Sequence, residues 1–211
     1  MSNGVEAHPA AGGERIRRLV NRAQSGDAGA FDDLVREYQQ PMFNLAFRMV
    51  NSREDADDLT QDIFVRLHRV IGQYRGESAF ETWLYTVAVN VCRSGRRRLN
   101  RVAHFESVRL DEERPESDTP RPAMEPVDPA DPPGKSLERK EMGQRVQELV
   151  AGLPEDLKTI LVLRDLQGLA YEEIAKILGC NMGTVKSRLF RARLEMKERL
   201  SREGLLCAVT K

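Results

Sequence analysis

Apolar residues recur every three or four positions over two long stretches of the chain, which is the spacing of one buried helix face. The first stretch predicts helices at residues 14–24, 28–50, 52–70 and 79–94, with a kink or restart at Pro41. The second predicts helices at residues 137–149, 155–165, 171–178 and 182–200. The pattern therefore predicts an all-α fold made of two small helical domains, residues 14–102 and 137–203.

The sequence between the two domains, residues 103–136, has a different character. Seven of the ten prolines lie between Pro115 and Pro133, among acidic and small residues. Such a composition cannot bury a core, so we expect a flexible acidic linker. Its charge would let it imitate a nucleic-acid strand in a cationic channel, but inert spacing is the simpler interpretation. We expect residues 1–13 and 204–211 to be tails.

The last two predicted helices are separated by a tight turn, with Gly179 ending the first and Asn181 capping the second. On a helical wheel one stripe of the second helix is apolar and must be buried: Val185, Leu189, Ala192, Met196 and Leu200. The opposite side carries Ser187, Phe190, Arg191 and Leu194, flanked by Lys186, Arg188 and Arg193, with Thr184 in the first turn and Arg164 before the turn.

These exposed side chains suit a helix that enters the major groove of DNA. Arginine pairs with guanine, serine serves either base, and an apolar side chain meets a thymine methyl. The flanking cations would lie near phosphates. The segment predicts a helix-turn-helix that reads duplex DNA. A basic helix that packs on a protein is the alternative.

The predicted helix at residues 52–70 buries Ala56, Leu59, Ile63, Leu67 and Val70. Its outward side carries Asp58, Gln61, Asp62 and Val65, with Phe64 to one side. The helix dipole stabilises acidic side chains near a helix N-terminus, so one interpretation is that this side of the helix simply faces solvent. An outward valine beside these polar groups also suits a docking surface for a basic partner helix, and from this segment alone both interpretations stay open.

The predicted helix at residues 79–94 has a core stripe of Phe80, Leu84, Val87 and Val91. A neighbouring face carries Trp83, Thr86 and Asn90 and leads into Arg93, Arg96, Arg97 and Arg98, with Tyr74 in the preceding loop. A tryptophan at the edge of a stripe is often only packed. Aromatic platforms beside an arginine cluster are, however, what binding of single-stranded nucleic acid requires.

Charged residues are distributed unevenly along the chain. The formal net charge is zero, yet residues 93–101 hold five arginines and no acid, whereas residues 106–141 hold eleven acids and six basic residues. Three scattered cysteines and three scattered histidines have no metal-ligand spacing, so we expect no metal, cofactor or disulfide framework. Without a membrane-length apolar run or a signal peptide, we expect a cytoplasmic protein with no membrane insertion.

Four motifs together resemble an extracytoplasmic-function (ECF) sigma factor, a minimal two-domain member of the sigma-70 family of bacterial transcription initiation factors. They are DADDLTQDIF from Asp55, FETWLYTVAVN from Phe80, LAYEEIAKILGC from Leu169 and GTVKSRLFRAR from Gly183. The resemblance covers about residues 15–102 and 137–203. Each motif alone is moderate evidence, and all four in this order are specific.

The resemblance implies that the first domain binds core RNA polymerase and the promoter −10 element. Asp58, Gln61 and Asp62 match the contact with the clamp helices of the β′ subunit. The element that captures a flipped non-template base is matched by the loop from Tyr74 through Arg75 to Ser78, together with Asn90. Trp83 and the arginines Arg93, Arg96 and Arg97 match residues that support melting and grip the backbone.

The second domain, by the same resemblance, reads the −35 element. The matching contact positions are Arg164, Lys186, Ser187, Phe190 and Arg191. An anti-sigma factor would hold the protein inactive, and the linker would thread toward the polymerase active site. The chain departs from the family pattern at Ala170, where a serine or threonine cap is expected, at Asn181-Met182, and in its longer, more acidic linker.

Two other functions remain to be weighed. An autonomous helix-turn-helix regulator would bind promoter DNA without polymerase and would leave Trp83, Tyr74 and Asn90 without a role. An enzyme acting on nucleic acid would need paired carboxylates, a metal cluster, a phosphate-binding loop or an activated nucleophile, and the sequence shows no such pattern. We therefore expect a protein without catalytic activity of its own.

Overall fold

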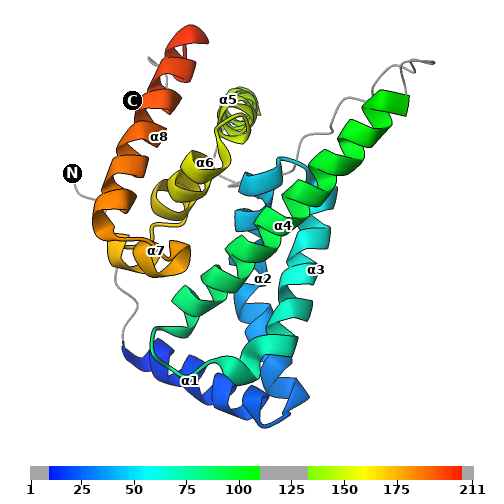
Figure 1. The fold of residues 1–211 in the computed structure, drawn as a ribbon, viewed down its shortest axis with the longest axis vertical. Helices are drawn as coiled ribbons and strands as arrows, with labels where there is room; N and C mark the ends of the chain where they lie inside the picture. Colours follow the sequence, from blue (N-terminus) through cyan, green and yellow to red (C-terminus); the bar gives the residue numbers. More distant parts are fainter. Residues whose placement is uncertain (1–9, 110–132, 206–211) are drawn as a thin grey trace.

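The computed structural model describes residues 10–109 and 133–205 of the chain, and its regular structure over these residues is helical. The first domain comprises α1 (Ala10–Gln24), α2 (Ala28–Val50), α3 (Arg53–Val70), the 3₁₀ turn η1 (Ile71–Gln73) and α4 (Phe80–Arg109). The second comprises α5 (Pro133–Ala151), α6 (Glu155–Leu161), η3 (Val162–Leu166), α7 (Tyr171–Leu178) and α8 (Met182–Arg202). The all-α prediction with two helical domains is confirmed (Figure 1).

The helices of the first domain begin and end where polar side chains cap them. The Asp27 carboxylate accepts a hydrogen bond from the Ala30 N–H at 3.1 Å, and the Ser52 hydroxyl accepts one from the Asp55 N–H at 3.3 Å. Between α2 and α3, Asn51 has a left-handed backbone with φ of 60°, a conformation that asparagine tolerates. The predicted stripe of α3 is buried from Ala56 to Val70. These contacts stack α2, α3 and α4 side by side, with α1 across one end (Figure 1).

Several helices are longer than the sequence pattern predicted. The first begins at Ala10, and α2 continues through Pro41 without a restart. Proline removes one backbone hydrogen bond, but the buried residues Met42 and Leu45 follow it at once, and their packing keeps the helix in place. Residues 103–109 and 133–136, assigned to the linker, belong to α4 and α5. The expected tails at 1–9 and 206–211 and the linker centre at 110–132 lie outside the described residues.

The second domain contains the predicted helix-turn-helix. Gly179 has φ of 61° at the end of α7, and the Asn181 side chain accepts a hydrogen bond from the Thr184 N–H at 2.8 Å. Ala170 offers no side-chain cap, but the Glu173 carboxylate accepts from the Ala170 N–H at 2.8 Å and so satisfies one N-terminal donor. The helix predicted at 155–165 changes from α-helical to π-helical at Val162.

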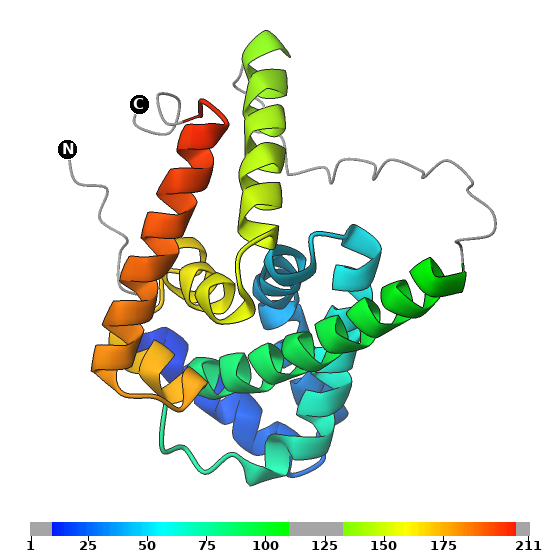
Figure 2. The same ribbon diagram turned by 45° about the horizontal axis from the view of Figure 1, so that its top comes forward.

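The two domains pack against each other. Figures 1 and 2 show α7 of the second domain lying beside the first turns of α4. The buried apolar residues of both domains form one continuous cluster. We call the contact between the domains the interdomain seam. Across it, the Tyr85 hydroxyl donates to the Gln167 side chain at 3.0 Å, and the buried Lys158 ammonium donates to the Met49 carbonyl at 3.4 Å.

Candidate nucleic-acid interface

A groove of about 670 Å³ lies between α3 and α4 on the first domain. Trp83, Thr86 and Asn90 all line it, so the face predicted for α4 faces this groove. Val87 and Val91, predicted as core, are only half buried and line the same groove. Val91 still packs against the core, but residues 88, 89 and 92 take the core side of α4, so the predicted stripe was wrong at Val87.

Arginines stand on both walls of this groove. Arg98 and Arg101 come from α4, and Arg66 and Arg69 come from α3. The α3 pair was missed from the sequence, although both residues lie on the solvent-facing side of α3 that also carries Asp62. A groove lined by aromatic, amide and guanidinium groups has the composition needed for a single nucleic-acid strand.

The loop that precedes α4 is held by an aromatic cluster. The Tyr74 ring lies 5.4 Å from the Phe80 ring and 5.3 Å from the Trp83 ring, centroid to centroid. The Tyr74 hydroxyl donates to the Ser78 carbonyl at 2.7 Å, and burial raises the pKa of Tyr74. Arg75, next in the loop, is exposed. Tyr74 and Trp83, predicted to act together, therefore lie in contact beside the groove.

The arginine run of α4 is divided between two surfaces. Arg93 turns toward the second domain, where its guanidinium lies 3.7 Å from the carboxylates of Glu155 and Asp156. Arg96 also faces that domain, since its charge contributes to lowering the pKa of Lys158. Arg97 is exposed, and Arg98 lies at the groove, 3.5 Å from Asp62. The predicted −10 arginines therefore do not form one patch in this packed arrangement.

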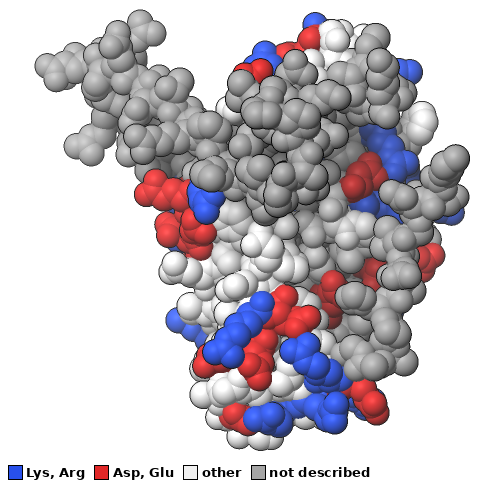
Figure 3. Space-filling view, turned by 180° about the vertical axis from the view of Figure 1, so that it is seen from behind, with Lys and Arg blue, Asp and Glu red and all other residues white. Residues whose placement is uncertain are grey.

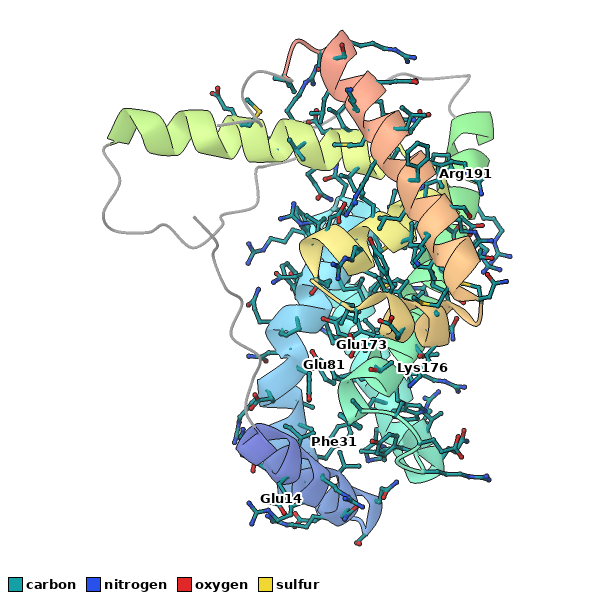
Figure 4. All side chains as sticks on the ribbon, turned by 90° about the vertical axis from the view of Figure 1, so that its left-hand side faces the viewer. Glu14, Phe31, Glu81, Glu173, Lys176 and Arg191 are labelled. Atoms are coloured by element: carbon teal, nitrogen blue, oxygen red, sulfur yellow. The ribbon has the colours of Figure 1, made fainter. Side chains whose placement is uncertain are left out.

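Helix α8, the second helix of the helix-turn-helix, has the predicted division of faces. Its five predicted core residues are all buried, and Lys186, Ser187 and Arg191 are exposed. Phe190 is 71% exposed and Leu194 is 48% exposed, so the two large apolar residues predicted for the outward side of α8 do face solvent. Figure 4 shows Arg191 on the outer side of α8. The Ser187 hydroxyl donates to the Thr184 carbonyl at 3.2 Å, while the Thr184 hydroxyl donates to Asn181 at 3.0 Å.

Three other predicted −35 contacts are engaged within the protein. Arg164 donates to the Leu169 carbonyl at 2.7 Å and stacks over the Tyr171 ring at 4.8 Å. Arg193 makes two hydrogen bonds to Asp165, at 2.6 and 3.0 Å, which raise the pKa of its guanidinium. Arg188 lies 3.4 Å from Asp156. Their charges stay on the surface of this domain, but their side chains are oriented by the fold.

The outward side of α3 is exposed as predicted. Asp58, Gln61 and Asp62 are all solvent-accessible, and Val65 is 50% exposed. Phe64, predicted to lie beside this surface, is instead part of the core. Asp62 also lines the groove, so the surface predicted for docking and the groove share one edge.

Acidic side chains of the second domain meet the arginines of the first at the interdomain seam. Asp156 approaches Arg93 of α4 with one oxygen and Arg188 of α8 with the other. Nearer the start of α4, the Thr82 hydroxyl donates to the Glu173 carboxylate at 3.3 Å. On the back of the molecule, acidic and basic side chains are interleaved at the end formed by α1 (Figure 3). No cluster that could hold a metal ion and no membrane-spanning helix occurs among the described residues.

The chain matches two protein-family models, Sigma-70 region 2 over residues 16–102 and Sigma-70 region 4 over residues 143–196. It is 39% identical over 181 residues to the RNA polymerase sigma-H factor of Pseudomonas aeruginosa, covering 85% of this chain and 91% of that protein. It is 41% identical over 175 residues to the ECF RNA polymerase sigma-E factor of Haemophilus influenzae, covering 83% of this chain and 89% of that protein.

Two solved structures share the fold. CnrH in complex with the cytosolic domain of CnrY is 22% identical, with a TM-score of 0.63 over 89% of this chain and 98% of that one. The sigma factor RpoE in complex with the anti-sigma factor NepR, from Bartonella quintana, is 24% identical, with a TM-score of 0.59 over 81% and 96%. With both conserved regions matched in order, the chain belongs to the sigma-70 family as an RNA polymerase sigma factor of the ECF group.

Proposed function

We propose that this sigma factor holds the non-template strand of the −10 element in the groove between α3 and α4. The side chains that line the groove are the observation that carries the proposal. A protein that binds only duplex DNA would not need aromatic and amide groups in such a groove. Trp83 and Tyr74 offer stacking surfaces, and Asn90 offers an amide for the exposed edge of an unpaired base. Arg98 and Arg101 would neutralise the phosphates that follow.

The exposed face of α8 would read the −35 element in the major groove. Arg191 and Ser187 supply donors for base edges, and Phe190 supplies an apolar contact for a thymine methyl. Lys186 would contact phosphate. Arg164, Arg188 and Arg193 would act mainly through their charge, since internal hydrogen bonds or ion pairs already fix their side chains.

Asp58, Gln61 and Asp62 would form the docking face for the β′ clamp helices of core RNA polymerase. Exposed carboxylates around the half-exposed Val65 fit a partner helix that is basic and partly apolar. The protein would then act in the cytoplasm, as a specificity subunit without catalytic activity of its own.

Simultaneous binding of the two elements would require the interdomain seam to open. Positions −35 and −10 are about 25 base pairs apart, or roughly 85 Å at the rise of B-DNA. A compact chain of this length has a radius of gyration of about 17 Å, so a packed molecule cannot span that distance. A partner that holds the domains together would keep the protein inactive. Because CnrH and the Bartonella RpoE were solved with CnrY and the anti-sigma factor NepR, we propose an anti-sigma partner here too.

Gel filtration with core polymerase tests the docking face. Asp58→Lys and Gln61→Ala should each reduce holoenzyme formation, because they reverse or remove exposed polar groups without touching the core. Glu54→Lys, an exposed change one turn away, is the matched control. Undiminished holoenzyme formation in both test variants would remove the docking assignment.

Transcription from a pre-melted −10 bubble separates this function from an autonomous regulator. A sigma factor should direct abortive synthesis by core polymerase from the bubble, and Trp83→Ala should weaken that activity. An autonomous regulator would bind the −35 duplex with equal affinity whether or not polymerase is present, and Trp83→Ala would have no effect.

A further inference from the structure

The last residue of α1 is attached to the loop that precedes α4. The Gln24 side-chain N–H₂ donates to the carbonyl of Ile71 at 2.9 Å and to the carbonyl of Tyr74 at 2.8 Å. Because both acceptors are carbonyl oxygens, the side-chain nitrogen and not its oxygen must face them. These residues are 47 and 50 positions away in the sequence, so the contact is tertiary.

The second bond fixes the backbone of the residue whose ring stands beside the groove. Tyr74 is held at its ring by Phe80 and Trp83 and at its hydroxyl by the Ser78 carbonyl. Gln24 holds its carbonyl. The loop continues into Arg75 and then Gly76, whose φ of +76° is a conformation that glycine adopts without strain. Gln24 therefore anchors the loop at Tyr74, the residue that Arg75 and Gly76 follow.

We propose that Gln24 is a positioning residue for capture of the −10 base, acting through the backbone of Tyr74. This rests on the proposed function of the groove. A captured base has to enter a preformed pocket. The hydrogen-bonding edge of one base can be distinguished from that of another only when the protein groups that face it are already in place. Without Gln24, Tyr74 keeps its aromatic contacts, but its carbonyl and the loop beyond it lose their anchor to α1. The expected loss is one of base discrimination more than of overall affinity.

The experiment uses holoenzyme assembled from core polymerase and the full chain. Wild-type holoenzyme first selects a preferred single-stranded −10 oligonucleotide from a randomised pool. Competition then compares this oligonucleotide with versions changed at one base. Gln24→Met keeps the side-chain length and removes the donor, and we expect it to reduce discrimination at the captured position about tenfold. Gln24→His places a ring N–H at the same distance from the backbone and should restore part of the discrimination.

Two controls separate positioning from general damage. Gln39→Met, an exposed change on α2, should leave discrimination unchanged, and thermal unfolding checks that each variant folds. Core affinity and binding of a −35 duplex should stay within twofold for all variants. An equal loss of affinity for every oligonucleotide would make Gln24 a purely structural residue, and unchanged discrimination would also overturn the proposal. If wild-type holoenzyme selects no base at all, the proposed function of the groove fails first, and the role of Gln24 fails with it.

Discussion

Arginine side chains with similar positions in the sequence have different surroundings in this protein. Arg191 is exposed on the outer side of α8, whereas Arg193, two residues later, makes two short hydrogen bonds to Asp165. An exposed guanidinium can turn both of its donor edges to a base. A guanidinium held by a carboxylate offers charge, but its direction is already set.

Arg191→Ala should therefore weaken −35 binding by about 1–3 kcal/mol and relax the base preference at one position. Lys186→Ala should weaken binding to all sequences alike and reduce the salt dependence of binding. Fluorescence anisotropy with a set of single-base variants of the −35 duplex measures both effects. A uniform loss for Arg191→Ala would mean that this residue contacts phosphate.

Lys158 is a buried cation at the seam, 1% exposed. Burial lowers its pKa to about 8, with the charges of Arg96 and Arg199 acting in the same direction and Glu155 opposing them. The pKa is lower in the folded protein than in the unfolded chain, so the protonated lysine destabilises the fold below pH 8. As pH rises from about 8 toward the ordinary lysine value of 10.5, this penalty disappears.

Lys158→Met should consequently be more stable than wild type at pH 7, by about 1 kcal/mol, because it removes a buried charge and fills the same volume. The difference in the free energy of unfolding should shrink as pH rises from 7 to 10. Urea unfolding at several pH values measures it, and Lys176→Met, an exposed change on α7, is the control. A constant difference across this pH range would contradict the lowered pKa.

Helices α3 and α4 are in close contact at Gly95. A Cβ atom added at this position would overlap the Leu59 side chain, which is 2% exposed and has little room to move. Glycine in a helix interior ordinarily costs stability. Here it permits the two walls of the groove to meet, so the separation of α3 and α4 depends on one missing methyl group.

Gly95→Ala should destabilise the protein by about 1–3 kcal/mol despite its better helix propensity. The second change Leu59→Ala should make room for the added methyl group, so that the two changes are less than additive. Gly143→Ala on α5, where an added Cβ meets nothing, should instead stabilise by about 0.5–1 kcal/mol. Denaturant unfolding compares these variants, and equal effects at the two glycines would argue against close packing at Gly95.

For the molecule as a whole, the seam combines a continuous apolar cluster with polar contacts in which the buried Thr82 and Tyr85 donate to partly exposed acceptors. Partly exposed ion pairs such as Arg93–Asp156, at 3.7 Å, contribute little individually. The hydrogen bond from the buried Tyr85 hydroxyl to Gln167 should contribute more to the stability of the seam. Without this hydroxyl, the Gln167 side-chain oxygen would lose a hydrogen bond in a contact that holds little water.

Tyr85→Phe should weaken the packed arrangement by about 0.5–1.5 kcal/mol and raise the fraction of open molecules. Energy transfer between dyes on exposed positions of α2 and α8 measures this fraction. The same variant should bind core polymerase slightly more tightly if opening is part of binding. Tyr74→Phe, which removes a hydroxyl hydrogen bond within the first domain, is the matched control. Identical energy transfer in wild type and Tyr85→Phe would show that this bond does not hold the seam closed.

Local spacing was enough to identify the buried stripes of α3 and α8. The stripes of α3 and α8, the caps at Ser52 and Asn181, and the left-handed Gly179 all match the structure, because each depends on residues within one or two turns. The exposed position of Phe190 follows from the same periodicity. The family motifs then identified the chain as a sigma factor without any tertiary information.

Contacts between distant residues decided the rest. Spacing alone could not tell that Val87 and Val91 would line a groove, since that depends on where α3 lies. It also could not tell which arginines would be free, or that Gln24 would reach a loop 50 residues away. Periodicity assigns a residue to a face of its own helix, whereas the partner of that face is set by packing between helices. The amino-acid sequence alone determined that the chain is helical and which sides of α3 and α8 are buried, and only the tertiary structure decided that the two domains share one core.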